Sequence, residues 1–379
     1  MKVAITLLVS CIAALLALGM VMLYSASMTQ VGSHYLMMQL IWCGMGLVSC
    51  ATMAAIDYTL LRKFIWPLLA VAVAALVLVL IPHVGLKING ARRWLGVGGF
   101  RLQPSELGKF AIILLLAWYC ERFQRQMRDW KRGIAIPAAI FTPMLLLIFI
   151  EPDRGTTILM CAVISVMLIT AGVRWQYFAV PLVLGLTALG LSIWHDPMRM
   201  KRIFAWLYLE ENKSGVGYQA WQAMLALGSG GVTGLGLGDS RQKLGFVPEH
   251  HTDFILSIIG EELGLITLLV VAAFIVIVLC GVWISLRARD NFGLMLGCGI
   301  TFLIGFQAFI NIGVVTSTLP NKGLPLPFIS YGGSNLMLML TCTGILLSIA
   351  RHAREIAASS VVAPDAPLTS GNPFAPRTT

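Results

Sequence analysis

Long apolar runs separated by short polar breaks dominate this chain. A helix of about 20 apolar residues spans the hydrocarbon core of a bilayer, and ten runs approach or exceed that length. They lie at residues 3–27, 35–56, 64–82, 104–120, 134–150, 155–173, 176–194, 253–286, 294–316 and 331–350. The pattern predicts an all-α, polytopic membrane protein with about ten transmembrane helices.

The composition agrees with this prediction. Of the 379 residues, 58% are hydrophobic and 12% are charged, whereas soluble domains carry about 25% charged residues. The net charge of +10 would suggest a nucleic-acid partner in a soluble chain, but here the basic residues cluster between apolar runs, so no such partner is expected. The eight cysteines lie in or beside apolar runs without metal-ligand spacing, which favours packing roles.

Basic residues between alternate runs predict the orientation. Loops rich in Lys and Arg stay in the cytoplasm, and the basic loops lie near residues 62–63, 122–132, 174, 287–289 and 351–354. With an even number of spans, both termini are then cytoplasmic. Residues 1–355 form the membrane domain, and the proline-rich segment 356–379 is expected to be a disordered cytoplasmic tail.

Two outer segments depart from simple connections. The loop at 83–103 carries Lys87, Arg92, Arg93 and Arg101, although the orientation rule disfavours cations there. The segment 195–252 is a long, polar, glycine-rich extracytoplasmic loop without a span of its own. Loops of this length usually carry function.

The clearest candidate for catalysis is Asp253, where the long loop meets the eighth run. Partial desolvation at this boundary would raise its pKa toward the range of a general base. The alternative is that Asp253 or Thr252 simply caps the helix. Adjacent histidines at 250 and 251 have the wrong spacing for a preformed zinc site. A Mg²⁺ or Mn²⁺ ion recruited with a pyrophosphate, through Glu249 or Asp253, is a further expectation, so the metal requirement stays open.

Cations at 92–93 indicate phosphate binding. Arginines beside Trp94 at a membrane surface suit a lipid-linked phosphate, because guanidinium groups bind phosphate oxygens in pairs. Glu106 and Lys109 are three residues apart on the fourth span, which favours an ion pair facing a cavity or each other. The alternative is an interfacial anchor with a structural ion pair.

Prolines and glycines at 152–156 and 325–334 predict irregular backbone at membrane depth, which is tolerated where it lines protein or a wet cavity. Together with Arg92, Arg93, Glu106, Lys109 and Glu249, three further residues are candidates for substrate binding. They are Lys243, Ser330 and Ser334.

At these positions the chain resembles the SEDS family (shape, elongation, division and sporulation), the membrane peptidoglycan polymerases typified by FtsW and RodA. Six ordered motifs carry the resemblance: YSAS at 24–27, NGARRW at 89–94, QPSE at 103–106, PDRGT at 152–156, PEHHTDFI at 248–255 and SYGGS at 330–334. Glu151 stands where the family often has glutamine, and Arg154 where it often has an apolar residue. The segment 318–325 is more similar to division-type and sporulation-type members than to elongation-type ones.

The resemblance implies a glycosyltransferase that polymerises lipid II at the outer face of the cytoplasmic membrane, with undecaprenyl pyrophosphate as leaving group. It maps an essential acidic residue onto Asp253. It also implies a class B penicillin-binding protein and other division proteins as partners, and the division septum as location. The alternatives are a lipid II flippase, an elongation-type polymerase, and a noncatalytic scaffold that recruits the transpeptidase.

Overall fold

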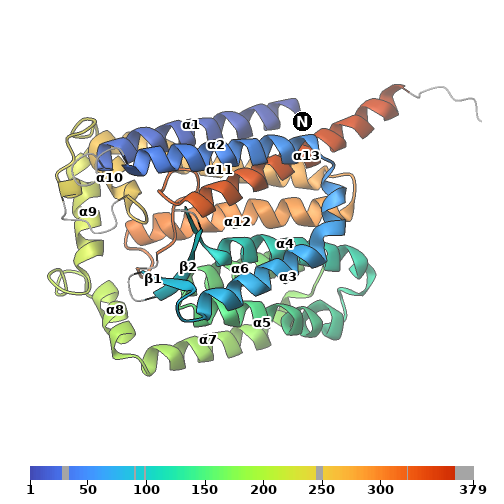
Figure 1. The fold of residues 1–379 in the computed structure, drawn as a ribbon, viewed down its shortest axis with the longest axis horizontal. Helices are drawn as coiled ribbons and strands as arrows, with labels where there is room; N and C mark the ends of the chain where they lie inside the picture. The colour runs from blue at the N-terminus through green and yellow to red at the C-terminus, as the bar shows by residue number, and fades with distance from the viewer. Residues whose placement is uncertain (28–33, 89–90, 98–99, 245–250, 322, 363–379) are drawn as a thin grey trace, which may run out of the picture.

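The computed structural model describes residues 1–27, 34–88, 91–97, 100–244, 251–321 and 323–362. Its long helices run roughly parallel in one bundle (Figure 1). The helices are α1 (Lys2–Ser27), α2 (His34–Ala55), α3 (Leu61–Leu80), α4 (Pro104–Arg122), α5 (Ile136–Ile150), α6 (Arg154–Thr170), α7 (Ala179–Trp194), α8 (Pro197–Leu207), α9 (Tyr218–Gly230), α10 (Ile255–Leu263), α11 (Thr267–Leu286), α12 (Asn291–Val315) and α13 (Gly333–Val362).

The prediction of a polytopic helical membrane protein is confirmed. In the described part of the chain, eight helical segments are long and apolar enough to cross a membrane. The other two predicted spans correspond to α4, which carries Glu106, Lys109, Glu121 and Arg122, and to α6, which has only 17 residues. The count of ten spans therefore stays a prediction.

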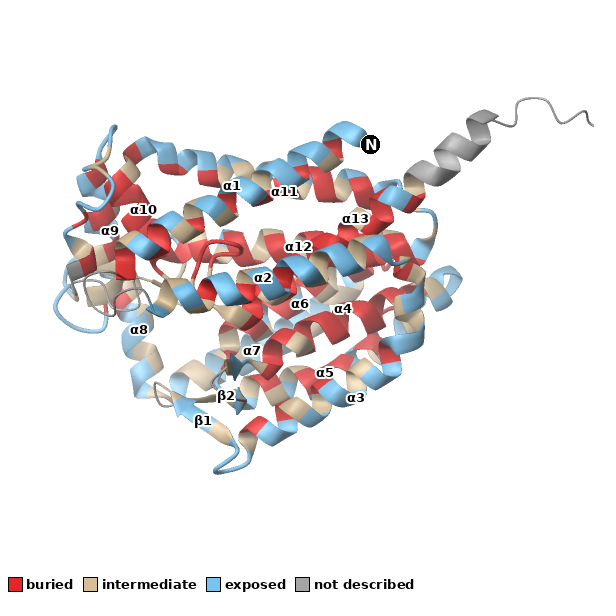
Figure 2. Cartoon of the chain, turned by 45° about the horizontal axis from the view of Figure 1, so that its top comes forward, coloured by how far each residue is buried: buried red, intermediate tan, exposed pale blue. Residues whose placement is uncertain are grey.

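Helices α4 and α12 form the centre of the bundle. Helix α12 packs against α4, α6, α11 and α13, and almost every residue of α4 is buried. Figure 2 shows buried residues along most of both helices. A helix enclosed on all sides holds charged groups at low cost only if they pair inside the protein.

Small residues allow α11 and α12 to approach closely. A Cβ atom at Gly281 would lie 2.4 Å from Oγ1 of Thr301, and one at Gly297 would lie 2.4 Å from Oγ of Ser285. Because the hydrophobic effect contributes little to helix association in lipid, close packing at small residues such as these supplies much of the attraction.

One end of the bundle, here called the inner end, brings the predicted cytoplasmic loops together. Arg62 pairs with Glu121 at 2.7 Å and also with Asp290, and the Tyr58 hydroxyl donates to Asp290 at 2.8 Å. These residues come from the start of α3, the end of α4 and the start of α12. The contacts agree with the prediction that these loops share one side of the membrane.

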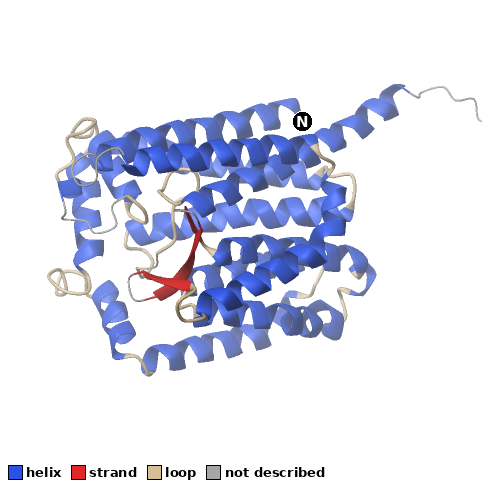
Figure 3. Cartoon of the chain, in the orientation of Figure 1, coloured by secondary structure: helices blue, strands red, loops and turns tan. Residues whose placement is uncertain are grey.

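The opposite, outer end carries a small antiparallel sheet, which the all-α prediction missed (Figure 3). Its strands are β1 (Gly85–Ile88), β2 (Ala91–Val97) and β3 (Phe100–Leu102), in the order β1-β2-β3. Leu86 lies opposite Trp94, and Leu95 opposite Leu102. Cross-strand apolar pairs of this kind stabilise short strands, but strands of three to seven residues give too short a pattern to stand out beside membrane helices.

The outer segment 195–252 holds the short helices α8 and α9, neither long enough to span a bilayer.

The eighth predicted run is broken at Gly264, where φ is +58° and the short turn Gly264–Ile266 separates α10 from α11. Helix α13 extends through Val362, past the predicted domain boundary at residue 355. The remainder of the predicted tail, 363–379, lies outside the described residues.

Candidate functional site

A cavity of about 830 Å³ opens at the outer end of the bundle. Strand β2, the turn between α5 and α6, helices α7, α8 and α9, and the segment 319–323 contribute to its wall, together with Asp253. Its charged lining residues are Arg93, Arg154, Arg199, Arg202, Asp153, Asp196 and Asp253. The cavity thus brings together two sequence-predicted residues, Arg93 and Asp253, from positions 160 residues apart in the chain.

Asp253 lies in the turn immediately before α10. The N-cap position of α10 is Phe254, without a side-chain hydrogen bond, so neither Thr252 nor Asp253 takes the capping position considered above. The backbone of this turn is held from two sides: Nδ2 of Asn311 donates to the Asp253 carbonyl at 2.8 Å, and the Ser330 hydroxyl donates to the Thr252 carbonyl at 2.6 Å. The main chain that presents the carboxylate is therefore fixed.

Gly323 makes room for the Asp253 side chain. A Cβ atom at this position would lie 2.5 Å from Oδ2 of Asp253, which is too close for any larger residue without a shift. The glycine thus lets the segment after α12 pass directly against the carboxylate.

Strand β2 directs Arg93 toward the cavity. Alternate residues of a strand point to opposite faces, so Arg93 points away from the face shared by Arg92 and Trp94. Nε of Arg93 donates to the Glu151 carbonyl at 3.0 Å, and Nη2 donates to the Pro152 carbonyl at 2.5 Å. These carbonyls lie at the carboxyl end of α5, where the helix dipole favours a cation.

Three further arginines share the cavity with Arg93. Arg154 lies within electrostatic range of Arg93, Arg199 and Arg202, and its one acidic neighbour in that set is Asp196. Asp196 already pairs with Arg199 at 2.6 Å. Like charges held this closely repel one another, so an anion bound among these arginines would relieve the repulsion.

Sequence reasoning placed Arg154 in the 152–156 motif and noted it as a departure from the family pattern, but it did not propose Arg154 as a binding residue, and it missed Arg199 and Arg202. The available signal was their spacing: residues three apart on a helix share one face, and both lie on α8. What the sequence did not reveal is that α8 turns this face toward the first residues of β2 and the start of α6.

Asp153 connects two of the predicted motifs. Its carboxylate accepts hydrogen bonds from the Thr156 amide and hydroxyl, which makes it the N-cap of α6. It also accepts from Nε2 of Gln103 at 3.2 Å. The 103–106 and 152–156 motifs are therefore one connected structure beside the cavity.

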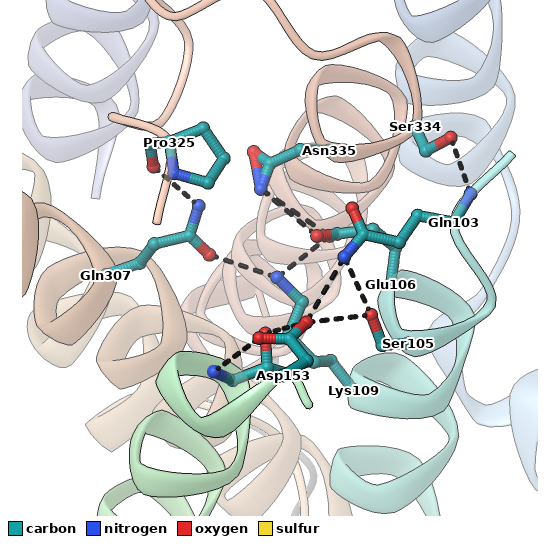
Figure 4. A network of polar contacts seen from close by, with 10 residues as sticks. Gln103, Ser105, Glu106, Lys109, Asp153, Gln307, Pro325, Ser334 and Asn335 are labelled. Atoms are coloured by element: carbon teal, nitrogen blue, oxygen red, sulfur yellow. Dashed lines mark hydrogen bonds and ion pairs between the residues drawn. The ribbon is translucent and has the colours of Figure 1, made fainter. Parts of the chain in front are cut away.

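The predicted ion pair between Glu106 and Lys109 is confirmed, with an Nζ–Oε2 distance of 2.8 Å (Figure 4). Lys109 also donates to Gln307 at 3.1 Å, and Asn335 lies 3.5 Å from the Glu106 carboxylate. Lys109 is 0% exposed and Glu106 5%. Neither residue lines the cavity. The pair instead links α4 to α12 through Gln307 and to α13 through Asn335.

Lys243 is also buried in the protein and is not part of the cavity lining. Its ammonium lies 3.2 Å from Glu262 and donates to the Ser25 hydroxyl at 3.1 Å. The adjacent Glu261 accepts from the amide of Arg241 and the hydroxyl of Ser240. These contacts fasten the end of the long outer loop to α10 and α1.

The hydroxyls of the two predicted serines are engaged by the main chain. Ser330 accepts from the Leu326 amide at 2.8 Å while donating to Thr252. Ser334 donates to the Arg101 carbonyl and accepts from the Gln103 amide. Ser330 therefore positions the turn that carries Asp253, and Ser334 joins β3 to α13.

Two predicted residues remain, Arg92 and Glu249. Arg92 lies on β2 opposite Lys87 and is not part of the cavity lining. Glu249 lies outside the described residues. Within the described ranges, no group of three or more His, Cys, Asp or Glu side chains is arranged to hold a metal ion.

The fold and the cavity define a polytopic membrane protein with a cavity at one end that is lined by four arginines and three aspartates. A family model described as "Cell cycle protein" and covering FtsW, RodA and SpoVE matches residues 5–355. The chain belongs to this family, as the motifs indicated.

Similar proteins extend this finding. The chain is 42% identical over 343 residues to a probable peptidoglycan glycosyltransferase FtsW of Geobacter metallireducens, covering 89% of this chain and 92% of the relative. It is 39% identical to stage V sporulation protein E of Bacillus subtilis, covering 90% and 95%.

Solved structures similar to this chain agree with the family assignment. One, described as the structural coordination of polymerization and crosslinking by a peptidoglycan synthase complex, matches with a TM-score of 0.77 at 27% identity, covering 91% of this chain and 97% of that one. The rod shape determining protein RodA of Thermus thermophilus matches with a TM-score of 0.69 at 28% identity, covering 91% and 96%.

Proposed function

We propose that this chain is a peptidoglycan glycosyltransferase that polymerises lipid II into glycan strands at the outer face of the cytoplasmic membrane, in septal wall synthesis. The observation that carries the proposal is the outer cavity that holds Asp253 together with four arginines. Relatives named peptidoglycan glycosyltransferase support it. Both termini would be cytoplasmic.

Asp253 would act as general base. It would take the proton from the 4-hydroxyl of the acceptor sugar as that oxygen attacks the anomeric carbon of the donor. The bond from this carbon to the pyrophosphate oxygen breaks, and the undecaprenyl pyrophosphate leaves with the bonding electrons, giving inversion and a β-1,4 link. A positioned base commonly contributes about 10²–10⁴-fold to the rate.

The arginine cluster would stabilise the charge that grows on the leaving pyrophosphate. Cationic donors fixed before the reaction stabilise such charge without reorganisation. A Mg²⁺ or Mn²⁺ ion carried by the pyrophosphate stays part of the proposal, although the described residues offer no metal cluster and no step depends on it.

Helix α7 supports a lipid-linked substrate. No residue of α7 is buried, and its main contacts among the described elements are with its neighbours α8 and Trp175–Phe178. Figure 1 places it along the edge of the bundle. Leu189 and Ile193 of α7 nevertheless line the cavity, so a prenyl chain in the bilayer could pass beside α7 while its pyrophosphate reaches the arginines.

Inorganic pyrophosphate should bind the arginine cluster. We expect it to raise the unfolding temperature of the purified protein, and Arg154→Met and Arg202→Gln each to weaken binding about tenfold, because a hydrogen bond to a charged group contributes about 1.5–3 kcal/mol and 1.4 kcal/mol is tenfold. Thermal unfolding against pyrophosphate concentration measures this. Arg174→Gln, an exposed arginine that lines neither cavity, is the control, and equal affinities in all four proteins would contradict the assignment.

The second candidate function is lipid II transport. A flippase needs one path to both leaflets, whereas the cavity that holds Asp253 and the arginine cluster opens at the outer end, which favours the enzyme. A class B penicillin-binding protein is the proposed partner, supported by the similarity to a synthase complex that coordinates polymerization and crosslinking. Other division proteins are expected around it.

The test is glycan polymerisation from purified lipid II in detergent, by this chain alone and with its cognate class B penicillin-binding protein. We expect long glycan strands in the presence of the partner. Absence of glycan in both samples, together with lipid II transfer across proteoliposomes, would replace the polymerase with the flippase.

A further inference from the structure

Glu151 is a buried carboxyl group that the proposed mechanism does not use. It is the C-cap residue of α5, in the turn that leads to Asp153 and α6. Its side chain is 0% exposed, and among the described residues neither carboxyl oxygen has a hydrogen-bond partner. A buried carboxylate without partners is unfavourable, whereas the neutral acid is tolerated.

A charge on Glu151 would act on two cavity residues beside it, Arg93 and Asp153. Arg93 donates to the main-chain carbonyls of Glu151 and Pro152 rather than to the carboxyl group. Asp153, two residues on, is occupied by Thr156 and Gln103. A negative charge on Glu151 would compete with the two carbonyls for the Arg93 guanidinium and would repel Asp153, and both of these residues line the cavity.

We infer that Glu151 is a positioning residue whose side chain must be uncharged, so that its ionisation moves Arg93 and the 151–153 turn and stops the reaction in the cavity. The charged groups that face it are Arg93 from β2 and Asp153 from the turn. Beyond them, Glu106 of α4 lies within range of Asp153, and Arg154 within range of Arg93.

Burial and the neighbouring charges set the pH range in which Glu151 ionises. Burial, followed by the negative charge of Asp153, raises the pKa of Glu151 to about 8, while Arg93 acts in the opposite direction. The group is therefore mainly protonated at neutral pH and ionises as the pH rises through about 8. About one tenth of the molecules keep the neutral acid one pH unit above this value.

Unfolding tests the inference without any activity. A carboxyl group whose pKa is raised in the folded state loses its stabilising effect as pH rises from its ordinary range through about 8. Glu151→Gln is a neutral replacement of the same shape. We expect the wild-type unfolding temperature to fall more steeply than that of the variant between about pH 6 and about pH 9. The exposed carboxylate Glu210, changed to glutamine, is the matched control and should follow the wild type.

Polymerisation tests the positioning role, and this part rests on the proposed function. Glu151→Gln should match the wild type near neutral pH. One pH unit above the Glu151 pKa, the wild type should fall about tenfold, whereas Glu151→Gln keeps its plateau and Glu210→Gln falls with the wild type.

The two failures are distinguishable. Identical alkaline loss in wild type and Glu151→Gln, or parallel unfolding profiles, would overturn the role of Glu151 and leave the polymerase proposal standing. If no glycan forms at any pH, the proposed function fails, and the unfolding profiles still decide whether Glu151 is the buried neutral acid. The infrared C=O stretching band of a protonated carboxyl group, present in the wild type and lost in Glu151→Gln at neutral pH, is the direct readout.

Discussion

Asp253→Asn should fold normally and lose polymerisation by about 10²–10⁴-fold, the usual contribution of a general base. The amide occupies the space of the carboxylate but does not accept the proton of the attacking hydroxyl. The backbone contacts from Asn311 and Ser330 to the turn involve main-chain carbonyls and do not depend on the side chain. The loss should therefore appear in turnover and not in the unfolding temperature.

The measurement is glycan yield from lipid II by the wild type and the variant under the same conditions, each with the partner transpeptidase. Asp239→Asn, an exposed carboxylate on the same outer segment, should remain active. Near-wild-type turnover by Asp253→Asn would move the base elsewhere. Support of cell division by an inactive Asp253→Ala protein would favour the scaffold interpretation over the enzyme.

The membrane helices could be predicted because each depends on a local property, the length of an apolar run. The predicted run at 35–56 corresponds to α2, and the run at 294–316 to α12. The strands β1–β3 depend instead on pairing across a turn, which a run of apolar residues does not report. Helix α10 separates from α11 at Gly264, which has a positive φ and packs against the backbone of residues 231–234, about 30 residues earlier in the sequence.

The candidate site was predictable where chemistry and position coincide in one motif. Asp253 and Arg93 each stand at the predicted outer boundary, and the structure places both in one cavity. Arg199 and Arg202 looked like ordinary basic residues of a long loop, because their role depends on where α8 packs. Being a candidate from the sequence also did not separate residues that line the cavity from residues that support it: Ser330 and Lys243 both make internal contacts.

The charge pair in the wall should have the largest effect on stability. Lys109→Met leaves Glu106 buried in the bundle without its cation, and removing one partner of a buried pair typically costs about 3–5 kcal/mol. Gln307 would also lose the donor that its side-chain oxygen accepts from. We expect a large drop in the unfolding temperature of the purified protein, and Glu106→Gln should destabilise it in the same direction.

The double variant Glu106→Gln with Lys109→Met separates charge from packing. Replacing both members of a buried pair with neutral groups of similar volume is often close to neutral, so the double variant should be more stable than either single variant. Thermal unfolding of all four proteins forms a double-mutant cycle, which isolates the coupling between the two residues. If the double variant loses the sum of the two single losses, the side chains contribute through separate contacts, and the ion pair is not what holds α4 against α12 and α13.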